Sequence, residues 1–319
     1  MSRPPRTFID VSNPTETIPQ RGPSGAGRRL SAYLFRHRWL QLGGLLAGPI
    51  GWLAIAYLGS LVVLFLASFW RLDTFSGEVV HDYGFQNYEE LLTNDVYRTI
   101  TIRTVAIAAA VTVADALIAF PIAYYMARLA TPRVRRALII AVLMPLWASY
   151  LVKVYAWQIL FQEGGMIDWA LSPLGLRSPF EISGTAEWKQ YAAVWITFTY
   201  LWLPYMILPI YAGLERMQPS LLEASSDLGA HAGTTFRRVV VPLAFPAVVA
   251  GSIFTFSLTL GDYITPQLVS STQFIGNVVY ANVGVANNLP FAAAYATVPV
   301  FIMIIYLLGA KKAGAFEHV

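Results

Sequence analysis

Six long apolar stretches dominate this sequence and limit what the chain can fold into. A bilayer core about 30 Å thick is crossed by roughly 20 apolar residues in a helix, which satisfies its own backbone hydrogen bonds. Of all residues, 56% are hydrophobic and only 13% are charged, whereas a soluble domain carries charge on about 25%. We therefore predict an all-α, polytopic membrane protein with six transmembrane helices. These spans are expected near 45–69, 100–127, 137–160, 191–213, 241–262 and 290–309.

The positive charges outside these stretches predict the orientation of the chain. Sixteen Lys and Arg lie in the two tails and in the connections after the second and fourth stretches, whereas the other three connections hold four. The sixteen are Arg3, Arg6, Arg21, Arg28, Arg29, Arg36, Arg38, Arg128, Arg133, Arg135, Arg136, Arg216, Arg237, Arg238, Lys311 and Lys312. Cytoplasmic segments of membrane proteins carry such an excess. We therefore expect both termini in the cytoplasm.

The segments between and around the spans complete the predicted domain organisation. Residues 1–44 are rich in Pro, Ser, Gly and Arg, so we expect a cytoplasmic basic tail that is largely disordered. A basic arm that binds anionic lipid is the alternative interpretation. Residues 45–310 form the transmembrane domain, including a cytoplasmic loop at 214–240, and residues 311–319 form a second cytoplasmic tail. The first apolar stretch lies too far from the N-terminus to be the core of a cleaved signal peptide.

Several kinds of chemistry are not supported by the composition. There is no cysteine, which excludes thiolate chemistry and disulfides, and the four histidines are too scattered to indicate a metal site. The sequence lacks the G-x4-G-K-[ST] pattern that cradles nucleotide phosphates. A net charge of +4 is weak support for nucleic-acid binding. We therefore expect no cofactor, no catalytic residue, no nucleic-acid partner and no enzymatic activity in the chain itself.

The loop between the fourth and fifth stretches contains the pattern of a short amphipathic helix. Ser220 followed by Glu223 fits a capping box, and Gly229 fits a left-handed C-terminal cap. Thr234 or Thr235 could cap the helix that follows. A narrow apolar face recurs at helical spacing, at Leu221, Leu222, Ser225 and Leu228. Because a helix of two turns is not stable alone, we expect it to pack against a cytoplasmic partner.

The same loop resembles the EAA motif of ABC importer permeases, which is written E-A-A-x3-G-x9-I-x-L-P. The anchors that fall in register are Glu223, Ala224, Gly229, Val239, Val241 and Pro242. Ser225 stands where the motif has its second alanine, and valines stand where it has isoleucine and leucine. The spacing is intact over twenty residues, in a loop that directly precedes the penultimate span.

This resemblance implies the type I ABC importer permease fold and a set of partners. In that family the loop forms a coupling helix that docks in a groove of a separate ABC ATPase, and closure of two ATPase copies on ATP opens the permease outward. The other implied partners are a second homologous permease subunit, an extracytoplasmic solute-binding protein and the lipid bilayer. The residues implied in coupling are Leu222, Glu223, Ala224, Ser225, Asp227, Leu228, Gly229 and Ala230. Glu223 could instead only cap its own helix, and Gly229 could matter only for its backbone conformation.

Other segments narrow the resemblance to the polyamine-type branch of the family. They are Phe85–Leu92, Pro145–Ser149, Lys153–Trp157, Tyr200–Tyr211, Gly261–Pro266 and Ile275–Asn277. The likeness covers about residues 45–310 and is greatest to the first permease of spermidine/putrescine importers, which implies a polyamine substrate. Opines, aminoethylphosphonate and ferric iron are carried by the same branch and stay open as alternatives. A six-span secondary transporter is the runner-up class, although it leaves the register of the loop as a coincidence.

Acidic and aromatic residues inside the apolar stretches indicate where an organic cation could pass. A charge at the bilayer centre costs roughly 2.5–3.5 kcal/mol, so such side chains normally face a cavity or the bundle interior. The expected path residues are Asp115, Trp157, Tyr200, Tyr205, Asp262 and Tyr263. Three alternatives stay open: Asp115 pairs with Lys153 as an internal strut, Asp262 caps a helix end, and the aromatics form an interfacial belt. Lys153 would repel a polyamine.

Overall fold

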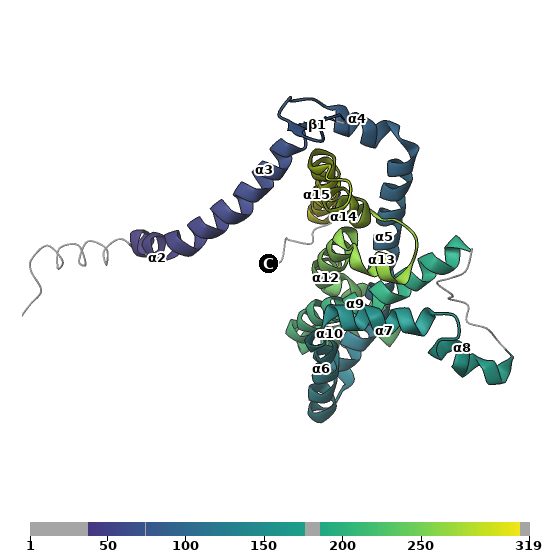
Figure 1. The fold of residues 1–319 in the computed structure, drawn as a ribbon. Coiled ribbons are helices and arrows are strands. Elements are labelled where there is room, and N and C mark those ends of the chain that lie inside the picture. The colour runs from purple at the N-terminus through teal and green to yellow at the C-terminus, as the bar shows by residue number, and fades with distance from the viewer. Residues whose placement is uncertain (1–37, 74, 176–185, 313–319) are drawn as a thin grey trace, which may run out of the picture. The chain divides into compact units, whose positions relative to one another are not determined.

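The computed structural model describes residues 38–73, 75–175 and 186–312 (Figure 1). The chain divides into two compact units, Met1–Val62 and Val63–Val319. Helix α2 (Arg38–Leu53) and the π-helical turn η1 (Ala54–Leu58) belong to the first unit, and α3 (Gly59–Ala67) runs across the boundary. The helical run Leu42–Ala67 is long and apolar enough to cross a membrane. Most of the predicted basic tail and most of the C-terminal tail lie outside the described residues.

The second unit consists of helices and one short hairpin. Strand β1 (Arg71–Leu72) pairs antiparallel with β2 (Val79–Val80), with Arg71 opposite Val80. The helical elements are α4 (Gln86–Thr93), α5 (Asp95–Tyr124), η2 (Tyr125–Leu129), α6 (Pro132–Trp147), α7 (Tyr150–Phe161), α8 (Met166–Leu171), η3 (Ser172–Leu174), α9 (Glu187–Arg216), α10 (Pro219–Asp227), α11 (Ala232–Thr235), η4 (Phe236–Val240), α12 (Val241–Gly261), α13 (Ile264–Val269), α14 (Ile275–Gly284) and α15 (Leu289–Lys312). Among the described residues, five helical runs are long and apolar enough to cross a bilayer, or six if one bent pair is a single span. The predicted fold class is confirmed.

Helices α5 and α9 pack side by side in this unit and run in the same direction. Near their starts, the Arg103 guanidinium lies 5.3 Å from the centre of the Tyr191 ring. Near their ends, Arg128 donates a hydrogen bond to the carbonyl of Leu214. The two pairs are separated by 88 and 86 residues in the sequence, so the helices keep nearly the same register throughout.

The third central helix, α12, runs antiparallel to α9 and approaches it very closely. A Cβ atom added at Gly213 would lie 2.5 Å from Cβ of Ala247, and one at Gly251 would lie 2.7 Å from the Met206 sulfur. Small residues are the usual means by which membrane helices pack tightly, because lipid provides no hydrophobic drive between them. The buried face of α5 follows the same rule, with alanine at three of its seven positions: Ile100, Thr104, Ala108, Val111, Asp115, Ala119 and Ala123.

The predicted span at 137–160 is not a single straight helix. It consists of α6 and α7, which meet at a 91° bend. Ala148 and Ser149 have extended backbones (ψ 141° and 135°), which interrupt the helix. Helical hydrogen bonding resumes in α7, where the Lys153 N–H donates to the Ser149 carbonyl. Pro145 lacks an N–H and so weakens the last turn of α6. The sequence pattern predicts the apolar stretch but not the bend, because apolar composition does not report such a break.

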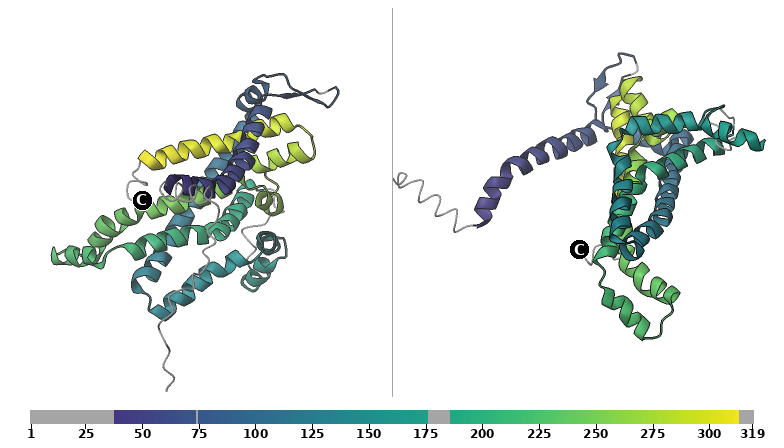
Figure 2. Two further views of the ribbon diagram at one scale, coloured as in Figure 1. Left: turned by 90° about the vertical axis from the view of Figure 1, so that its left-hand side faces the viewer. Right: turned by 90° about the horizontal axis from the view of Figure 1, so that it is seen from below.

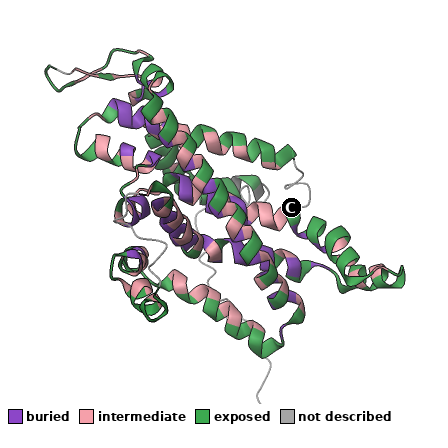
Figure 3. Ribbon diagram, turned by 90° about the vertical axis from the view of Figure 1, so that its right-hand side faces the viewer, coloured by how far each residue is buried: buried purple, intermediate pink, exposed green. Residues whose placement is uncertain are grey.

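Buried residues are concentrated where α5, α9, α12 and α15 face one another, whereas α6, α10 and α11 bury none (Figure 3). The segment between α9 and α12 that contains α10 and α11 projects from one end of the unit (Figure 2). The largest of the four clusters of buried side chains among the described residues lies at this end and joins α5, η2, α9, η4 and α12. We call this cluster, from Ala119 to Ala244, the inner cluster.

Candidate coupling site

Helix α10 is separated from the end of α9 by a connection of two residues, Met217 and Gln218. Its first residue is Pro219, which is favoured there because its φ is fixed near the helical value and its missing N–H needs no partner. The residue before the helix is Gln218, whose side chain makes no capping bond. Ser220 already lies inside the helix. The predicted capping box between Ser220 and Glu223 is therefore wrong, because Pro219 starts the helix one residue earlier than the pattern assumed.

The end of α10 is closed by a left-handed turn at Gly229. Its φ is +76°, a value that costs little only for glycine and a few other residues. The Gly229 N–H donates to the Ser226 carbonyl at 2.8 Å, and the Ala230 N–H donates to the Ser225 carbonyl at 3.1 Å. These two bonds satisfy carbonyls that the end of a helix otherwise leaves unpaired. The left-handed cap expected at Gly229 is confirmed.

A second short helix, α11, follows and is tied back to α10. Its preceding residue is His231, whose carbonyl accepts hydrogen bonds from the N–H groups of Thr234 and Thr235. Neither threonine caps the helix, contrary to expectation, because both already lie within its first turn. The Thr235 hydroxyl instead lies 2.8 Å from that of Ser225 on α10. We call residues 219–235 the elbow, since this bond joins its two arms.

The elbow has one face on the protein and one face without a partner. Leu222 packs on the inner cluster and fixes α10 to the bundle. Leu228, whose side chain is 87% exposed, and Glu223, which is also exposed, lie outside this contact, so Leu228 does not pack with Leu222 on one apolar face as its spacing predicts. Within the part of the chain that the structure describes, Glu223 makes no hydrogen bond or ion pair, so it does not cap α10. Of the eight residues predicted to couple, five are exposed: Glu223, Ala224, Asp227, Leu228 and Gly229.

The predicted path residues do not form one site, and Asp115 stands apart from the others. It lies on the buried face of α5 with no exposed surface. Among the described residues, neither of its carboxylate oxygens has a hydrogen-bond partner, and no ion pair joins it to Lys153. The register of α5 with α9 places it at the level of Trp202, whose indole N–H is also buried without an acceptor. The alternative of a strut with Lys153 is not what the structure shows.

Asp262 binds the start of helix α13, which agrees with the alternative that it caps a helix end. Its Oδ1 accepts hydrogen bonds from the N–H groups of Ile264 (2.8 Å) and Thr265 (3.1 Å) at the start of α13. The hydroxyl of Tyr150 donates to its Oδ2. Its neighbour Tyr263 stacks on Tyr280, with ring centres 4.6 Å apart. The carboxylate of Asp262 is thus already engaged by the protein.

The remaining aromatic residues lie where α7 meets α9. The rings of Trp157 and Tyr200 are 5.4 Å apart, and those of Tyr205 and Trp202 are 5.9 Å apart. Tyr150 stacks on Trp202 at 6.0 Å and so connects this group to Asp262. Sequence reasoning missed Tyr150. Its only signal was its place beside Ser149, where the apolar stretch is interrupted by a polar residue.

The elbow, α9, α12 and the end of α5 lie within the part of the chain that matches a known family. Residues 119–311 match the binding-protein-dependent transport system inner membrane component family, which is more than half of the chain. The chain belongs to this family. This permease is also 43% identical over 297 residues to the inner membrane ABC transporter permease protein YdcU of Escherichia coli K12, covering 91% of this chain and 95% of YdcU. It is therefore a multi-pass inner-membrane ABC transporter subunit, and the runner-up class of secondary transporter is set aside.

More distant relatives of the permease carry a named substrate. The spermidine/putrescine transport system permease protein PotB of Haemophilus influenzae is 30% identical over 212 residues, covering 66% of this chain and 72% of PotB. PotB of Escherichia coli K12 is 28% identical over 263 residues, covering 81% and 92%. A crystal structure of a bacterial alginate ABC transporter bound to its periplasmic protein contains a chain with a TM-score of 0.66 and 17% identity, covering 88% and 96%. That likeness concerns the fold alone.

Proposed function

We propose that this permease forms half of the translocation pathway of an ATP-driven importer for a polyamine or a similar organic cation. The observation that carries the ATP-driven part is the elbow. It is a short helix with both ends defined, held to the bundle by Leu222, and it presents unpartnered polar and apolar side chains on its outer face. A surface of that kind suits docking to another protein. The partner would be an ABC ATPase, present in two copies and opposed by a second permease subunit.

The elbow would act by moving as a rigid piece. A frayed helix would absorb a displacement, whereas α10 is closed by the turn at Gly229 and joined to α11 by the Ser225–Thr235 bond. Since α10 follows α9 and α11 leads into α12, a displaced elbow pulls on two of the three central helices. ATP closure would thus be converted into a change in the packing of the bundle. The cytoplasmic position of the elbow follows from the positive-charge pattern.

Asp115 and the likeness to PotB support an organic cation as the substrate. A buried carboxylate without a partner at the level of Trp202 can receive an ammonium group, and the neighbouring aromatic faces can stabilise its charge. Two PotB proteins share 28–30% identity with the permease. The alginate transporter has the same fold, and it imports an acidic polysaccharide. The fold by itself therefore does not identify the substrate.

Uptake by the complete importer tests this proposal. The permease would be reconstituted in proteoliposomes with its ATPase, second permease and binding protein, and supplied with spermidine, putrescine, an opine, aminoethylphosphonate or ferric iron. We expect ATP-dependent accumulation of the polyamines and no accumulation when the ATPase is omitted. Accumulation of an anion or of iron in place of polyamines would overturn the substrate class. Uptake without the ATPase would overturn the coupling role of the elbow.

A further inference from the structure

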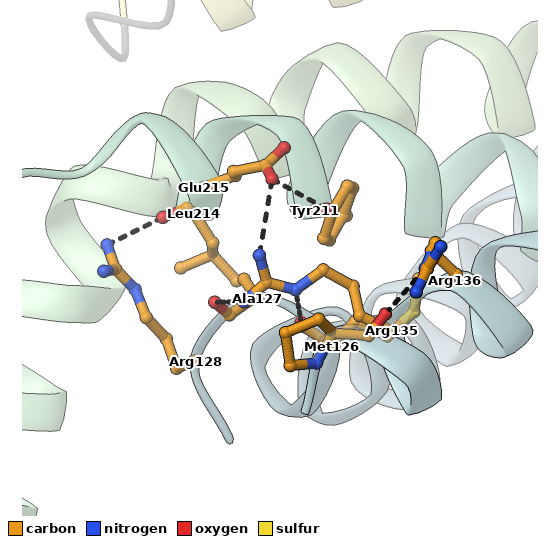
Figure 4. Close-up of polar contacts among 9 residues, drawn as sticks. Met126, Ala127, Arg128, Arg135, Arg136, Tyr211, Leu214 and Glu215 are labelled. Atoms are coloured by element: carbon orange, nitrogen blue, oxygen red, sulfur yellow. Dashed lines mark hydrogen bonds and ion pairs between the residues drawn. The ribbon is translucent and has the colours of Figure 1, made fainter. Parts of the chain in front are cut away.

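Arg128 holds the junction between α9 and the elbow. It lies on η2, the π-helical end of α5, and its Nη2 donates to the carbonyl of Leu214 at 2.7 Å (Figure 4). The same Nη2 also donates to the carbonyl of Met217 at 2.7 Å. Helix α9 ends at Arg216, Met217 is its C-cap, and α10 begins at Pro219. Carbonyls at the end of a helix lack the partners that the helix interior provides, and here the Leu214 carbonyl accepts only a 3.3 Å bond from the Met217 N–H among the described backbone groups. One guanidinium therefore binds two of these carbonyls and fixes the two-residue connection from which α10 starts.

Arg135 binds the end of the neighbouring helix in the same way. It lies near the start of α6, and its Nε and Nη2 donate to the carbonyls of Met126 (3.0 Å) and Ala127 (3.1 Å) on η2. Its Nη1 is 3.7 Å from Oε1 of Glu215 on α9, which also accepts a hydrogen bond from Tyr211 at 2.9 Å (Figure 4). The ion pair is half exposed and contributes little. The bonds to the two carbonyls are the stronger link.

The two arginines together join three helices directly beside the elbow. Arg128 links η2 to α9, and Arg135 links α6 to both of them. The carbonyls that they bind belong to Met126, Ala127, Leu214 and Met217, which are all buried in the inner cluster. Leu222 of the elbow packs on that same cluster. A guanidinium is planar with five donors in a fixed fork, so it can hold two carbonyls at once in one geometry.

From these contacts we infer that Arg128 and Arg135 form a rigid joint through which movement of the elbow is passed to α5 and α6. This inference rests on the proposed coupling function. Without the joint, a pull on α10 would be absorbed by Met217 and Gln218, which lie between the two helices. Each is tied to its neighbouring helix by one backbone hydrogen bond, from the Met217 N–H to the Leu214 carbonyl (3.3 Å) and from the Leu221 N–H to the Gln218 carbonyl (3.2 Å). With the joint, the pull reaches three helices together. The two arginines are positioning residues, since they act through the elbow and have no contact with a substrate.

Substitution of Arg128 tests the joint in the complete importer. Arg128→Met removes both hydrogen bonds and one charge. Arg136→Met removes one positive charge from α6, where among the described residues Arg136 bonds only the carbonyl of Pro132 on its own helix, and it is the matched control. For Arg128→Met we expect normal insertion and co-purification of the ATPase, with about a tenfold fall in substrate moved per ATP hydrolysed. Arg136→Met should keep the wild-type ratio. Equal ratios in the two variants would overturn the joint.

A conservative variant and a distance measurement cover the case in which Arg128→Met fails to assemble. Lysine keeps the charge but lacks the forked set of donors. The amount of substrate moved per ATP in Arg128→Lys should therefore lie between that of wild type and that of Arg128→Met. Spin labels at positions 125 and 228, both exposed in this chain without cysteine, report the distance between η2 and the elbow. We expect this distance to stay constant on ATP addition in wild type and to change in Arg128→Lys. A wild-type ratio and a constant distance in that variant would overturn the joint.

Failure of the joint can be told from failure of the coupling function. Gly229→Asp puts a charge on the exposed turn of the elbow, where docking is proposed, far along the chain from Arg128. If Gly229→Asp uncouples transport while Arg128→Met does not, the elbow couples and the joint is wrong. If Gly229→Asp transports normally at matched abundance, the coupling function itself is wrong.

Discussion

Asp115 and Asp262 are both buried acids in this permease, and the structure gives them opposite surroundings. The carboxylate of Asp262 accepts four hydrogen bonds, from the backbone N–H groups of Ile264 and Thr265 and from the hydroxyls of Tyr150 and Thr265. Asp115 accepts none from the described residues. A buried polar group without a partner costs about 1–3 kcal/mol, whereas a satisfied one is close to neutral or favourable. The two residues should therefore respond to substitution with opposite signs.

Asp115→Leu should make the permease more stable and less active. The change removes an unsatisfied buried carboxyl group, and we expect a gain of about 1–3 kcal/mol in the free energy of unfolding. Uptake of an organic cation by the complete importer should be lost, because the buried acid is no longer available. Thermal unfolding of the purified permease in neutral detergent and uptake in proteoliposomes measure the two effects. Retained uptake would remove Asp115 from the path, and a lower unfolding temperature would mean that the acid has a stabilising partner.

Asp262→Ala should destabilise the permease. It removes the acceptor for the first N–H groups of α13 and the partner of Tyr150, and loss of a comparable helix cap costs about 1–2 kcal/mol. We expect the unfolding temperature to fall under the same conditions in which Asp115→Leu raises it. In Asp262→Asn, which keeps one acceptor oxygen, the unfolding temperature should fall less. An unfolding temperature unchanged in Asp262→Ala would contradict the structural role.

At the scale of elements, the elbow depends on one backbone conformation. Gly229 has open space around the position that a Cβ would occupy, so only its positive φ restricts substitution. Asparagine adopts that φ more readily than most residues, whereas a β-branched residue does so at high cost. Substitutions at Gly229 therefore test the effect of backbone strain separately from the effect of side-chain size.

Gly229→Asn should keep coupling, whereas Gly229→Val should lose it. The expected strain for valine is roughly 1–2 kcal/mol, enough to fray the last turn of α10 and to weaken the Ser225–Thr235 link. Co-purification of the ATPase and substrate moved per ATP would be compared for the two variants at equal abundance. Equal coupling in both would show that the left-handed turn is not required.

Two of the elements illustrate what the sequence could and could not predict. The position of the elbow was predictable because residue spacing and turn residues are local signals. The left-handed turn at Gly229 was predicted correctly for the same reason. Its start was misplaced because Pro219 and Ser220 are both good N-terminal residues and only the backbone decides between them. The bend between α6 and α7 was missed because both sides of it are equally apolar. Likewise, partners such as Tyr150 for Asp262 are far apart in the sequence and depend on packing.

At the scale of the whole molecule, the positive-charge pattern predicts that β1, β2 and α4 face the outside and that the elbow faces the cytoplasm. Because the chain has no cysteine, single cysteines report this directly. Phe75 lies in the hairpin and Leu228 lies in the elbow, and both are highly exposed. A membrane-impermeant thiol reagent should label Phe75→Cys in intact cells and leave Leu228→Cys unlabelled. Leu228→Cys should react after permeabilisation of cells that lack the ATPase. Labelling at position 228 in intact cells would contradict the orientation.

The buried carboxylate of Asp115 also sets a condition on how the permease is made. Trp202, which lies at its level on α9, is translated 87 residues later, or roughly 4–17 s at 5–20 residues per second. During that interval α9 cannot shelter this acid, and a charge at the bilayer centre costs roughly 2.5–3.5 kcal/mol. We therefore expect α5 to stay at the insertion machinery, or beside water, for longer in the wild type than in Asp115→Leu.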